Sequence, residues 1–283
     1  MAGDHAPPNV VRETSSLATI IDVNLGGESF KADITRNPQF FGESWRAWES
    51  GEDEEALFSF IAEKTDPKGI FVDIGSYQGS VALLASRKYA KVFAFEADPV
   101  SVEALEDNIR VNEADNITII PRFVGDKKGT QSFYSMDRGN NSGSSAFHTE
   151  GKTRWEVETV RLDEFIAEAG CADAPIYLKI DIEGAEYLMI DSLRKTVANY
   201  DVRCICLSLH PFLLAKQVKG QSLPAKLRRR ALVLSRTLQI LSAVGRYKTV
   251  TDARGKPVSR ARLIGDIIRT GRHRVTDREI YLT

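Results

Sequence analysis

Two acidic residues and two glycines stand where short apolar runs end, and this placement could bind a ribose-containing ligand. The apolar run 69–75 includes Asp73 and ends at Gly75, and Gly79 follows shortly after it. Glycines at such a turn let the backbone approach a ligand closely. Glu96 closes the next run, at about the 20-residue distance expected for a carboxylate that accepts hydrogen bonds from both ribose hydroxyls. The sequence therefore predicts a ligand site at the ends of these two runs.

The spacing of the glycines argues against a dinucleotide. A Gly-x-Gly-x-x-Gly fingerprint that starts at Gly75 needs glycines at positions 77 and 80. Those positions hold Tyr77 and Ser80. An acidic side chain at Asp73 suits a ligand with an ammonium group better than it suits a pyrophosphate. S-adenosylmethionine has such an ammonium, a sulfonium and no phosphate, and it is therefore the cofactor that the pattern favours.

A second group of polar side chains belongs to the apolar run 176–182 and its end. On a strand, Lys179, Asp181 and Glu183 point to one side in alternation. Three charges rarely share an interior face unless they pair with one another or with a ligand. We expect Asp181 or Glu183 to orient or deprotonate a hydroxyl, because the pKa of a hydroxyl lies far above neutral. A structural ion-pair network with Lys179 is the alternative.

His210 follows the next apolar run, 202–209, and is the imidazole best placed to act as a base. A structural histidine before Pro211 explains the position equally well. Asp181, Glu183 and His210 also offer the kind of ligands that could hold a divalent ion such as Mg²⁺. Their spacing is not diagnostic, so the sequence assigns no metal to them.

Alternating strands and helices must position these residues. Strand patterns occupy 69–75, 91–97, 117–120, 176–182 and 202–209, with helical patterns between them. This alternation predicts an α/β fold, a doubly wound, mostly parallel seven-stranded sheet with helices on both faces. Two short segments, 247–250 and 279–283, are expected to pair antiparallel at a sheet edge. Segment 123–134 resembles a hairpin that turns at 126–129.

The first part of the chain predicts separate elements. Residues 1–16 read as a disordered tail. Residues 17–34 predict a hairpin around Gly26-Gly27, and residues 39–64 predict one or two helices. The chain thus divides into a tail, an N-terminal extension over 17–66 and a main domain over 67–283. A basic helical insertion is expected at about 214–245 of the main domain.

Several motifs resemble those of the FkbM family of methyltransferases. They are Phe71-Val72-Asp73-Ile74-Gly75, Phe93-Ala94-Phe95-Glu96-Ala97-Asp98-Pro99, Asn108, Asn112, Val124-Gly125-Asp126 and, most specifically, Lys179-Ile180-Asp181-Ile182-Glu183-Gly184-Ala185-Glu186. The resemblance implies a class I methyltransferase domain, of the Rossmann-like kind, with S-adenosylmethionine as methyl donor. It also implies O-methylation of a sugar, a polyketide or a similar hydroxyl compound.

The same resemblance assigns residues to the cofactor. It places 122–125 beside the adenine and Asp181 beside the methyl-transfer centre. The family's usual Gly-Ala-Asn is Gly-Ser-Tyr here, so Tyr77 is expected to reshape the pocket. The basic region 216–236 is also longer than the family's usual connection. The full set of expected cofactor contacts is Asp73, Gly75, Ser76, Tyr77, Gly79, Glu96, Ala97, Val124, Gly125 and Asp181.

The motif after the fourth strand favours an oxygen acceptor. Amide and exocyclic-amine methyltransferases place Asn/Asp-Pro-Pro-Tyr/Phe there, whereas this chain has Asp181-Ile182-Glu183-Gly184. Loop 140–145 offers amide and hydroxyl groups suited to a polyol. We therefore expect a small-molecule or glycan acceptor, such as a hydroxyl of a sugar, a glycolipid or a related metabolite.

Charge is divided unevenly along the chain. Residues 211–283 carry 17 Lys and Arg against 4 Asp and Glu, although the whole chain has a net charge of −1. Such polarity can steer an anionic acceptor or partner. A nucleic acid is an alternative substrate for methylation, because the chain contains the run Arg228-Arg229-Arg230. We find no recognisable RNA-binding module and no aromatic residues among these arginines, which makes nucleic acid the weaker alternative.

The helical pattern 223–244 is amphipathic. Its apolar stripe consists of Leu227, Ala231, Leu234, Leu238 and Leu241. The pattern favours a helix packed on the sheet with its arginines in solvent. The alternative is peripheral contact with an anionic membrane, including a catalytically silent scaffold protein that kept the fold.

Composition predicts a cytoplasmic protein. No segment approaches the about 20 apolar residues needed to span a bilayer. Residues 1–16 lack the layout of a signal peptide. The three cysteines, Cys171, Cys204 and Cys206, do not form a disulfide framework, and we expect buried thiols in a reducing compartment.

Overall fold

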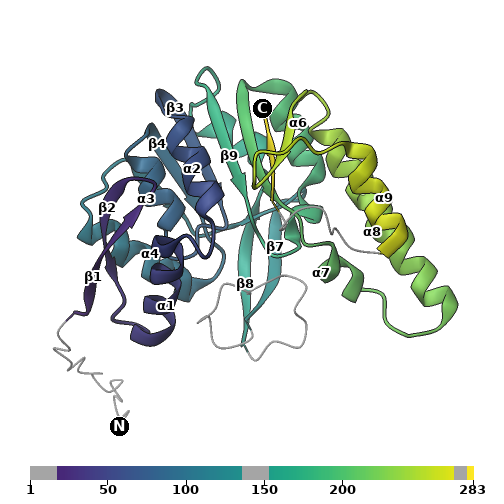
Figure 1. Cartoon of the computed structure of the whole chain (residues 1–283), viewed down its shortest axis with the longest axis horizontal. Coiled ribbons are helices and arrows are strands. Elements are labelled where there is room, and N and C mark those ends of the chain that lie inside the picture. The colour runs from purple at the N-terminus through teal and green to yellow at the C-terminus, as the bar shows by residue number, and fades with distance from the viewer. Residues whose placement is uncertain (1–17, 136–152, 271–278) are drawn as a thin grey trace, which may run out of the picture.

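A seven-stranded sheet runs through the centre of the molecule (Figure 1), with the strand order β11-β12-β10-β9-β3-β4-β5. The computed structural model describes residues 18–135, 153–270 and 279–283; the predicted tail 1–16 and loop 140–145 lie outside them. Neighbouring strands from β10 to β5 are parallel, and β12 is antiparallel to both β10 and β11. The predicted mostly parallel sheet with an antiparallel edge is confirmed. Its strands are β3 (Asp66–Ile74), β4 (Tyr89–Phe95), β5 (Ile117–Ile120), β9 (Ile176–Ile180), β10 (Val202–Ser208), β11 (Val250–Asp252) and β12 (Glu279–Leu282).

Helices cover both faces of this sheet because its strands carry apolar side chains on both sides. Val72 and Leu178 belong to one apolar cluster, whereas Phe71 and Val92 belong to the cluster on the other face. The first cluster is covered by α5 (Leu162–Glu168), α6 (Ile190–Asn199), α8 (Leu223–Ala243) and α9 (Arg260–Thr270). The second is covered by α1 (Pro38–Ser50), α2 (Glu55–Glu63), α3 (Ser80–Ser86) and α4 (Pro99–Val111).

The N-terminal extension is fastened to the turn that follows β3. The predicted hairpin forms as β1 (Ile20–Leu25) and β2 (Glu28–Asp33). Asn108 of α4 accepts a hydrogen bond from the Asp33 backbone at 2.7 Å and donates one to the Gln78 carbonyl at 2.8 Å. From α1, the Trp45 indole donates to the Gln78 side chain at 3.0 Å. The extension therefore supports the loop that the sequence assigned to the cofactor.

The predicted hairpin over 123–134 is wrong. A separate three-stranded sheet has the order β6-β8-β7, with β6 (Phe123–Val124), β7 (Gly129–Ser135) and β8 (Thr153–Val160). β6 pairs in parallel with β8, and β7 pairs with β8 in antiparallel fashion. The turn-like residues at 126–129 do connect β6 to β7. The partner of both strands is β8, which lies much later in the chain, so a local pattern could not reveal the pairing.

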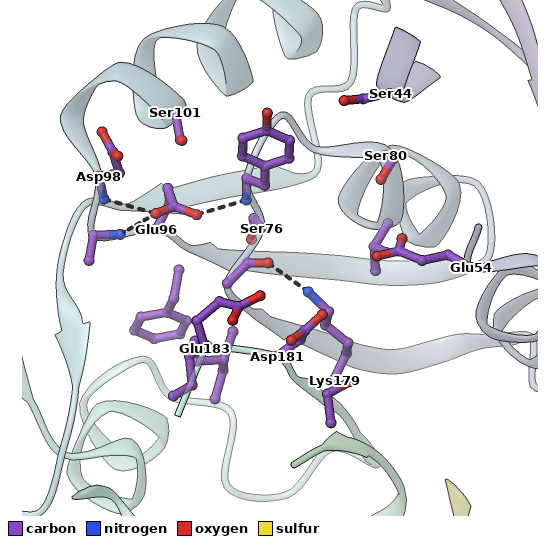
Figure 2. A pocket seen from close by; sticks show the side chains of 18 of the residues that line it. Ser44, Glu54, Ser76, Ser80, Glu96, Asp98, Ser101, Lys179, Asp181 and Glu183 are labelled. Carbon is purple, nitrogen blue, oxygen red and sulfur yellow. Dashed lines mark hydrogen bonds between the residues drawn. The ribbon is translucent and has the colours of Figure 1, made fainter. Parts of the chain in front are cut away.

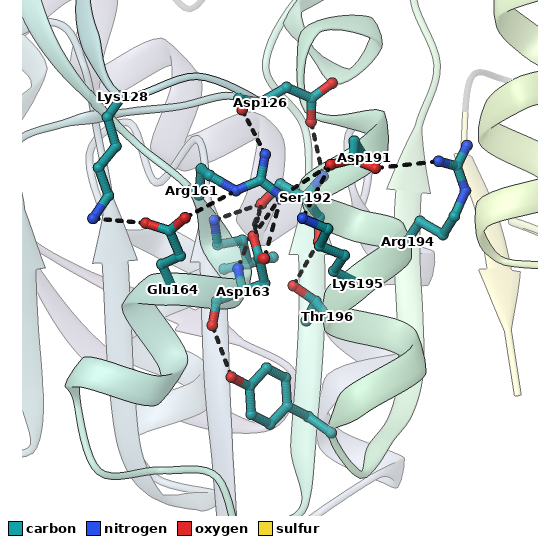
Figure 3. A network of polar contacts seen from close by, with 12 residues as sticks. Asp126, Lys128, Arg161, Asp163, Glu164, Asp191, Ser192, Arg194, Lys195 and Thr196 are labelled. Carbon is teal, nitrogen blue, oxygen red and sulfur yellow. Dashed lines mark hydrogen bonds and ion pairs between the residues drawn. The ribbon is translucent and has the colours of Figure 1, made fainter.

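Arg161, at the end of β8, joins this small sheet to the helices below it (Figure 3). Its guanidinium donates to the Asp126 carbonyl at 2.5 Å and forms ion pairs with Asp163 at 3.0 Å and Asp191 at 3.1 Å. The Ser192 hydroxyl donates to Asp163 at 2.9 Å. Charge-assisted bonds from one guanidinium thus hold the β6–β7 turn, α5 and α6 together.

Helix α8 forms where its pattern predicts, but of the predicted stripe only Leu241 is fully buried, so most of the stripe lies outside the packed face. Val233, Thr237 and Ile240 are buried, whereas Leu227 and Leu238 are exposed. Val233 and Ile240 lie about a quarter-turn around the helix from that stripe, and α6 and α9 contact α8. Among the described helices, none has the length and apolar content to span a bilayer.

Candidate active site

A cavity of about 510 Å³ opens at the carboxyl ends of the central strands. The strand order reverses around β3, because β4 lies on one side of it and β9 on the other. In open α/β sheets the crevice at such a point is where ligands bind. The cavity wall includes eleven residues that the sequence assigned to the site or to the adenine: Gly75, Ser76, Tyr77, Glu96, Ala97, Arg122, Phe123, Val124, Asp181, Glu183 and His210.

Gly75 lets the two central loops touch. Its φ is +88°, and a Cβ built on it would lie 1.9 Å from the Asp181 carbonyl oxygen. No other residue fits this approach without moving the backbone. Gly79 also has a positive φ. A Cβ built on it would lie 2.4 Å from the Leu105 side chain of the core, so only glycine leaves room for that leucine. Gly79 therefore shapes the turn and is absent from the cavity wall.

Glu96 accepts three backbone hydrogen bonds at the cavity wall (Figure 2). Its carboxylate binds the N–H groups of Tyr77 at 2.7 Å and of Ala97 and Asp98 at 2.8 Å each. Burial raises the pKa of Glu96 to about 7, although these hydrogen bonds favour the charged form. The side chain thus joins the loop after β3 to the loop after β4 and still faces the cavity.

Tyr77 takes the place of the family's usual asparagine, and the N-terminal extension explains its position. Its φ is +50°, a strained value for a side chain of this size. The Tyr77 ring packs nearly perpendicular to the rings of Phe41 and Trp48 of α1, with ring centroids 6.3 and 6.2 Å apart. Tyr77 and Trp48 line the cavity. Helix α1 therefore contributes a wall that the sequence did not assign to the site.

Asp73, which the sequence predicts as a cofactor contact, is not among the residues of the cavity wall. It is paired in register with Lys179 across β3 and β9, and its carboxylate lies 3.3 Å from the Lys179 ammonium. Both side chains are buried, and Lys179 also donates to the Gly75 carbonyl at 2.6 Å. Burial raises the pKa of Asp73, and Lys179 opposes that shift. The buried Asp73–Lys179 pair therefore stabilises the loop that follows β3 through the Gly75 carbonyl.

The predicted alternation of Lys179, Asp181 and Glu183 along one strand is also wrong. Strand β9 ends at Ile180, and Glu183 has a φ of +48°. Lys179 therefore pairs with Asp73 from within the sheet, whereas Asp181 and Glu183 lie in the loop, and all three of Lys179, Asp181 and Glu183 line the cavity. Gly125, another predicted cofactor contact, is likewise absent from the wall; a Cβ built on it would lie 2.9 Å from the Thr159 side chain.

Asp181, Glu183 and His210 form one cluster in the cavity. The His210 Nε2 atom lies 3.7 Å from Asp181 and 3.8 Å from Glu183, and Nδ1 lies 3.4 Å from Glu186. Burial disfavours the charged imidazole, but Glu186 and the two other carboxylates raise the pKa of His210 to about 9. A histidine that is already protonated at neutral pH cannot accept a proton. The raised pKa of His210 therefore favours a carboxylate over His210 as the base.

The same cluster has the geometry of a cation site. Asp181, Glu183 and His210 each offer one ligand atom, and these atoms lie within 4.8 Å of one another. Oxygen and imidazole ligands of this kind suit several divalent ions. A protonated His210 would have to lose its proton before it could bind a metal.

The sequence missed several carboxylates of the cavity wall, among them Glu54 and Glu279. Burial raises the pKa of Glu54 to about 8 and that of Glu279 to about 6. Glu54 precedes α2 with a φ of +56°, in the segment 39–64 that the sequence predicted only as helical. Within the described residues, acidic side chains outnumber Lys and Arg on this wall, a composition that favours a cationic ligand.

Comparison with known proteins gives a family match over the centre of the chain. The model of the methyltransferase FkbM domain matches residues 73–233. The uncharacterized protein MJ1452 of Methanocaldococcus jannaschii is 36% identical over 66 residues, which cover 23% of this chain and 26% of that protein. The chain thus aligns with about a quarter of this curated relative.

Two solved structures are similar in part. Methyltransferase FkbM from Methylobacillus flagellatus has a TM-score of 0.44 and 16% identity, over 88% of this chain and 60% of that chain. SMU.1697c of Streptococcus mutans, a putative methyltransferase in complex with SAH, has a TM-score of 0.34 and 10% identity, over 59% of this chain and 80% of that chain.

Proposed function

Because the chain belongs to the FkbM family of methyltransferases, we propose that it transfers a methyl group from S-adenosylmethionine to a hydroxyl of a sugar, a glycolipid or a related metabolite. One observation carries the proposal. A single cavity joins the loops that carry Gly75 and Glu96 to the cluster of Asp181, Glu183 and His210. A donor pocket and a proton acceptor are what O-methyl transfer requires side by side.

The residues present fit the donor. The absent Cβ of Gly75 allows close approach to the backbone, and Glu96 offers carboxylate oxygens of the kind that bind ribose hydroxyls. Gly75, Ser76, Glu96, Ala97 and Val124 would hold its nucleoside part. The acidic wall suits its sulfonium and ammonium charges. When bound, S-adenosylmethionine supplies a methyl group that its sulfonium already activates, so the protein need not activate the donor.

The protein's own task is to hold and deprotonate the acceptor hydroxyl. Asp181 and Glu183 face the cavity and can accept its hydrogen bond. We assign the role of proton acceptor to Asp181, because its backbone packs directly on Gly75 in the loop after β3, which would hold the methyl donor. The charged His210 holds both carboxylates in place from a buried position.

Glu96→Gln is expected to weaken binding of S-adenosylmethionine by about 10- to 100-fold, because the variant loses a charge-assisted hydrogen bond to the ribose. Isothermal titration calorimetry with the purified full chain measures this change. The matched control is Glu106→Gln on the exposed face of α4, which should bind like the unchanged protein. A folded wild-type protein that does not bind the donor would contradict the proposal and favour a catalytically silent scaffold.

Donor affinity should also fall as the pH drops below about 7. The pKa of Glu96 is raised from 4.5 to about 7, so the carboxylate is charged above that pH and takes up a proton below it. If the charged form binds the ribose, each further pH unit below 7 lowers the affinity by up to about tenfold. Calorimetry between pH 5.5 and pH 7.5 tests this slope. Glu96→Gln should remove it, and an unchanged slope in that variant would assign the titration to another group.

A further inference from the structure

Helix α8 exposes large apolar side chains to solvent, two in its first half and one in its second half. Leu223 is 70% exposed, Leu227 57% and Leu238 43%. Their spacing of 4 and 11 residues places them on one side of the helix, and we name them the leucine stripe. Ile20 is the only other large apolar residue with comparable exposure among the described residues. The apolar side that was expected to pack on the sheet is thus largely free.

The first half of α8 stands away from the body of the protein. No residue in 223–232 is buried, whereas Val233, Thr237 and Ile240 of the second half are. Figure 1 shows this half extending past α9 at the edge of the molecule. Arg229 donates to the carbonyls of Val218 and Gly220 at 3.0 and 2.9 Å, which ties the preceding connection to the helix. The exposed half is therefore an ordered projection of the fold.

Basic residues flank the leucine stripe, and no acidic residue opposes them. Lys226 and Arg230 lie on one side of the stripe and Arg228 on the other, and all three are exposed. Segment 211–251 contains no Asp or Glu. An apolar stripe between rows of cations complements an anionic lipid surface, where leucines enter the headgroup boundary and cations meet phosphates.

Two other occupants fit less well. A nucleic acid would meet the cations but would leave the leucines in water, and none of the residues in 223–243 is aromatic. A second copy of the chain would have to bury about 800 Å² on each partner, which three leucines and a charged border do not supply. We propose that the leucine stripe with Lys226, Arg228 and Arg230 docks the protein on an anionic membrane surface.

The placement of this surface connects it to the cavity. Helix α7 (Pro211–Lys216) begins directly after His210 and leads through 217–222 to the first residues of α8. Docking through α8 therefore holds the segment next to the cavity near the lipid surface. The docking proposal does not depend on methyl transfer, because it concerns only residues outside the cavity wall.

Vesicle flotation of the full chain tests the proposal. Vesicles of phosphatidylcholine with about 30% phosphatidylglycerol should bind the protein, and vesicles of phosphatidylcholine alone should not. Binding should fall when NaCl is raised from about 0.1 M to about 0.5 M. Leu223→Gln/Leu227→Gln and Arg228→Glu/Arg230→Glu should each weaken binding by at least about 30-fold.

Matched controls separate the surface from general effects. Ile20→Gln removes an exposed apolar residue elsewhere, and Lys68→Glu/Lys127→Glu reverses two exposed charges outside α8. Both should float like the unchanged protein, and all variants should keep the circular dichroism of the folded chain. The proposal is overturned by absent binding to the anionic vesicles, or by binding that the α8 variants leave unchanged. Binding of a labelled RNA in place of vesicles, or a dimer that Leu227→Gln dissociates, would equally overturn it.

Discussion

Lys179→Met is expected to lower the free energy of unfolding by about 3–5 kcal/mol, because it leaves Asp73 as an unpaired charge in the interior. The two side chains are 6% and 0% exposed, and the ion pair joins the central strands β3 and β9. Lys179 also donates a hydrogen bond to the Gly75 carbonyl, and the variant removes this bond from the loop after β3. Denaturant unfolding followed by circular dichroism measures the loss.

A second variant distinguishes the unpaired charge from a general packing defect. Asp73→Asn combined with Lys179→Met removes both charges and should recover most of the stability. Lys68→Met, on an exposed lysine, should change stability by less than about 0.5 kcal/mol. Since burial raises the pKa of Asp73, the defect of Lys179→Met should shrink as the pH falls and Asp73 takes up a proton. A double variant as unstable as Lys179→Met would refute the unpaired-charge explanation.

The sheet and the position of the cavity could be predicted because local patterns carry them. Buried parallel strands are short apolar runs, and Gly75 marks the turn where the first of them ends. Glu96 could be placed beside the cavity in the same way, since it is the residue that directly follows β4. These features depend on residues that are neighbours in sequence.

The features that were missed depend on neighbours in space. Asp73 faces Lys179 because of the register between β3 and β9, and no local pattern contains that register. Glu54 and Glu279 meet at one wall from opposite ends of the chain. The periodicity of α8 showed an apolar stripe correctly but not whether a partner covers it. The same stripe therefore predicted a packed helix, whereas in the structure only the second half of α8 packs on the core and the first half projects.

Asp181→Asn is expected to lower the rate of methyl transfer by about 10²- to 10⁴-fold, the usual contribution of a positioned general base. The asparagine keeps the shape of the side chain but cannot take the proton of the acceptor hydroxyl. Affinity for S-adenosylmethionine should stay within a few-fold, because the proposed nucleoside contacts lie at Gly75 and Glu96. Transfer of a labelled methyl group into a glycan and lipid extract, with calorimetry of the donor, separates the two effects.

Controls assign the proton acceptor within the cluster. Glu43→Gln removes another carboxylate of the cavity wall and should retain transfer. Glu183→Gln should cost less than Asp181→Asn if Glu183 only orients the hydroxyl, and the reverse order would move the base to Glu183. Transfer should also survive chelation of divalent ions with EDTA. Because Asp181, Glu183 and His210 offer ligand atoms within 4.8 Å of one another, activity lost to EDTA and restored by Mg²⁺ would show that the cluster activates the hydroxyl through a metal ion.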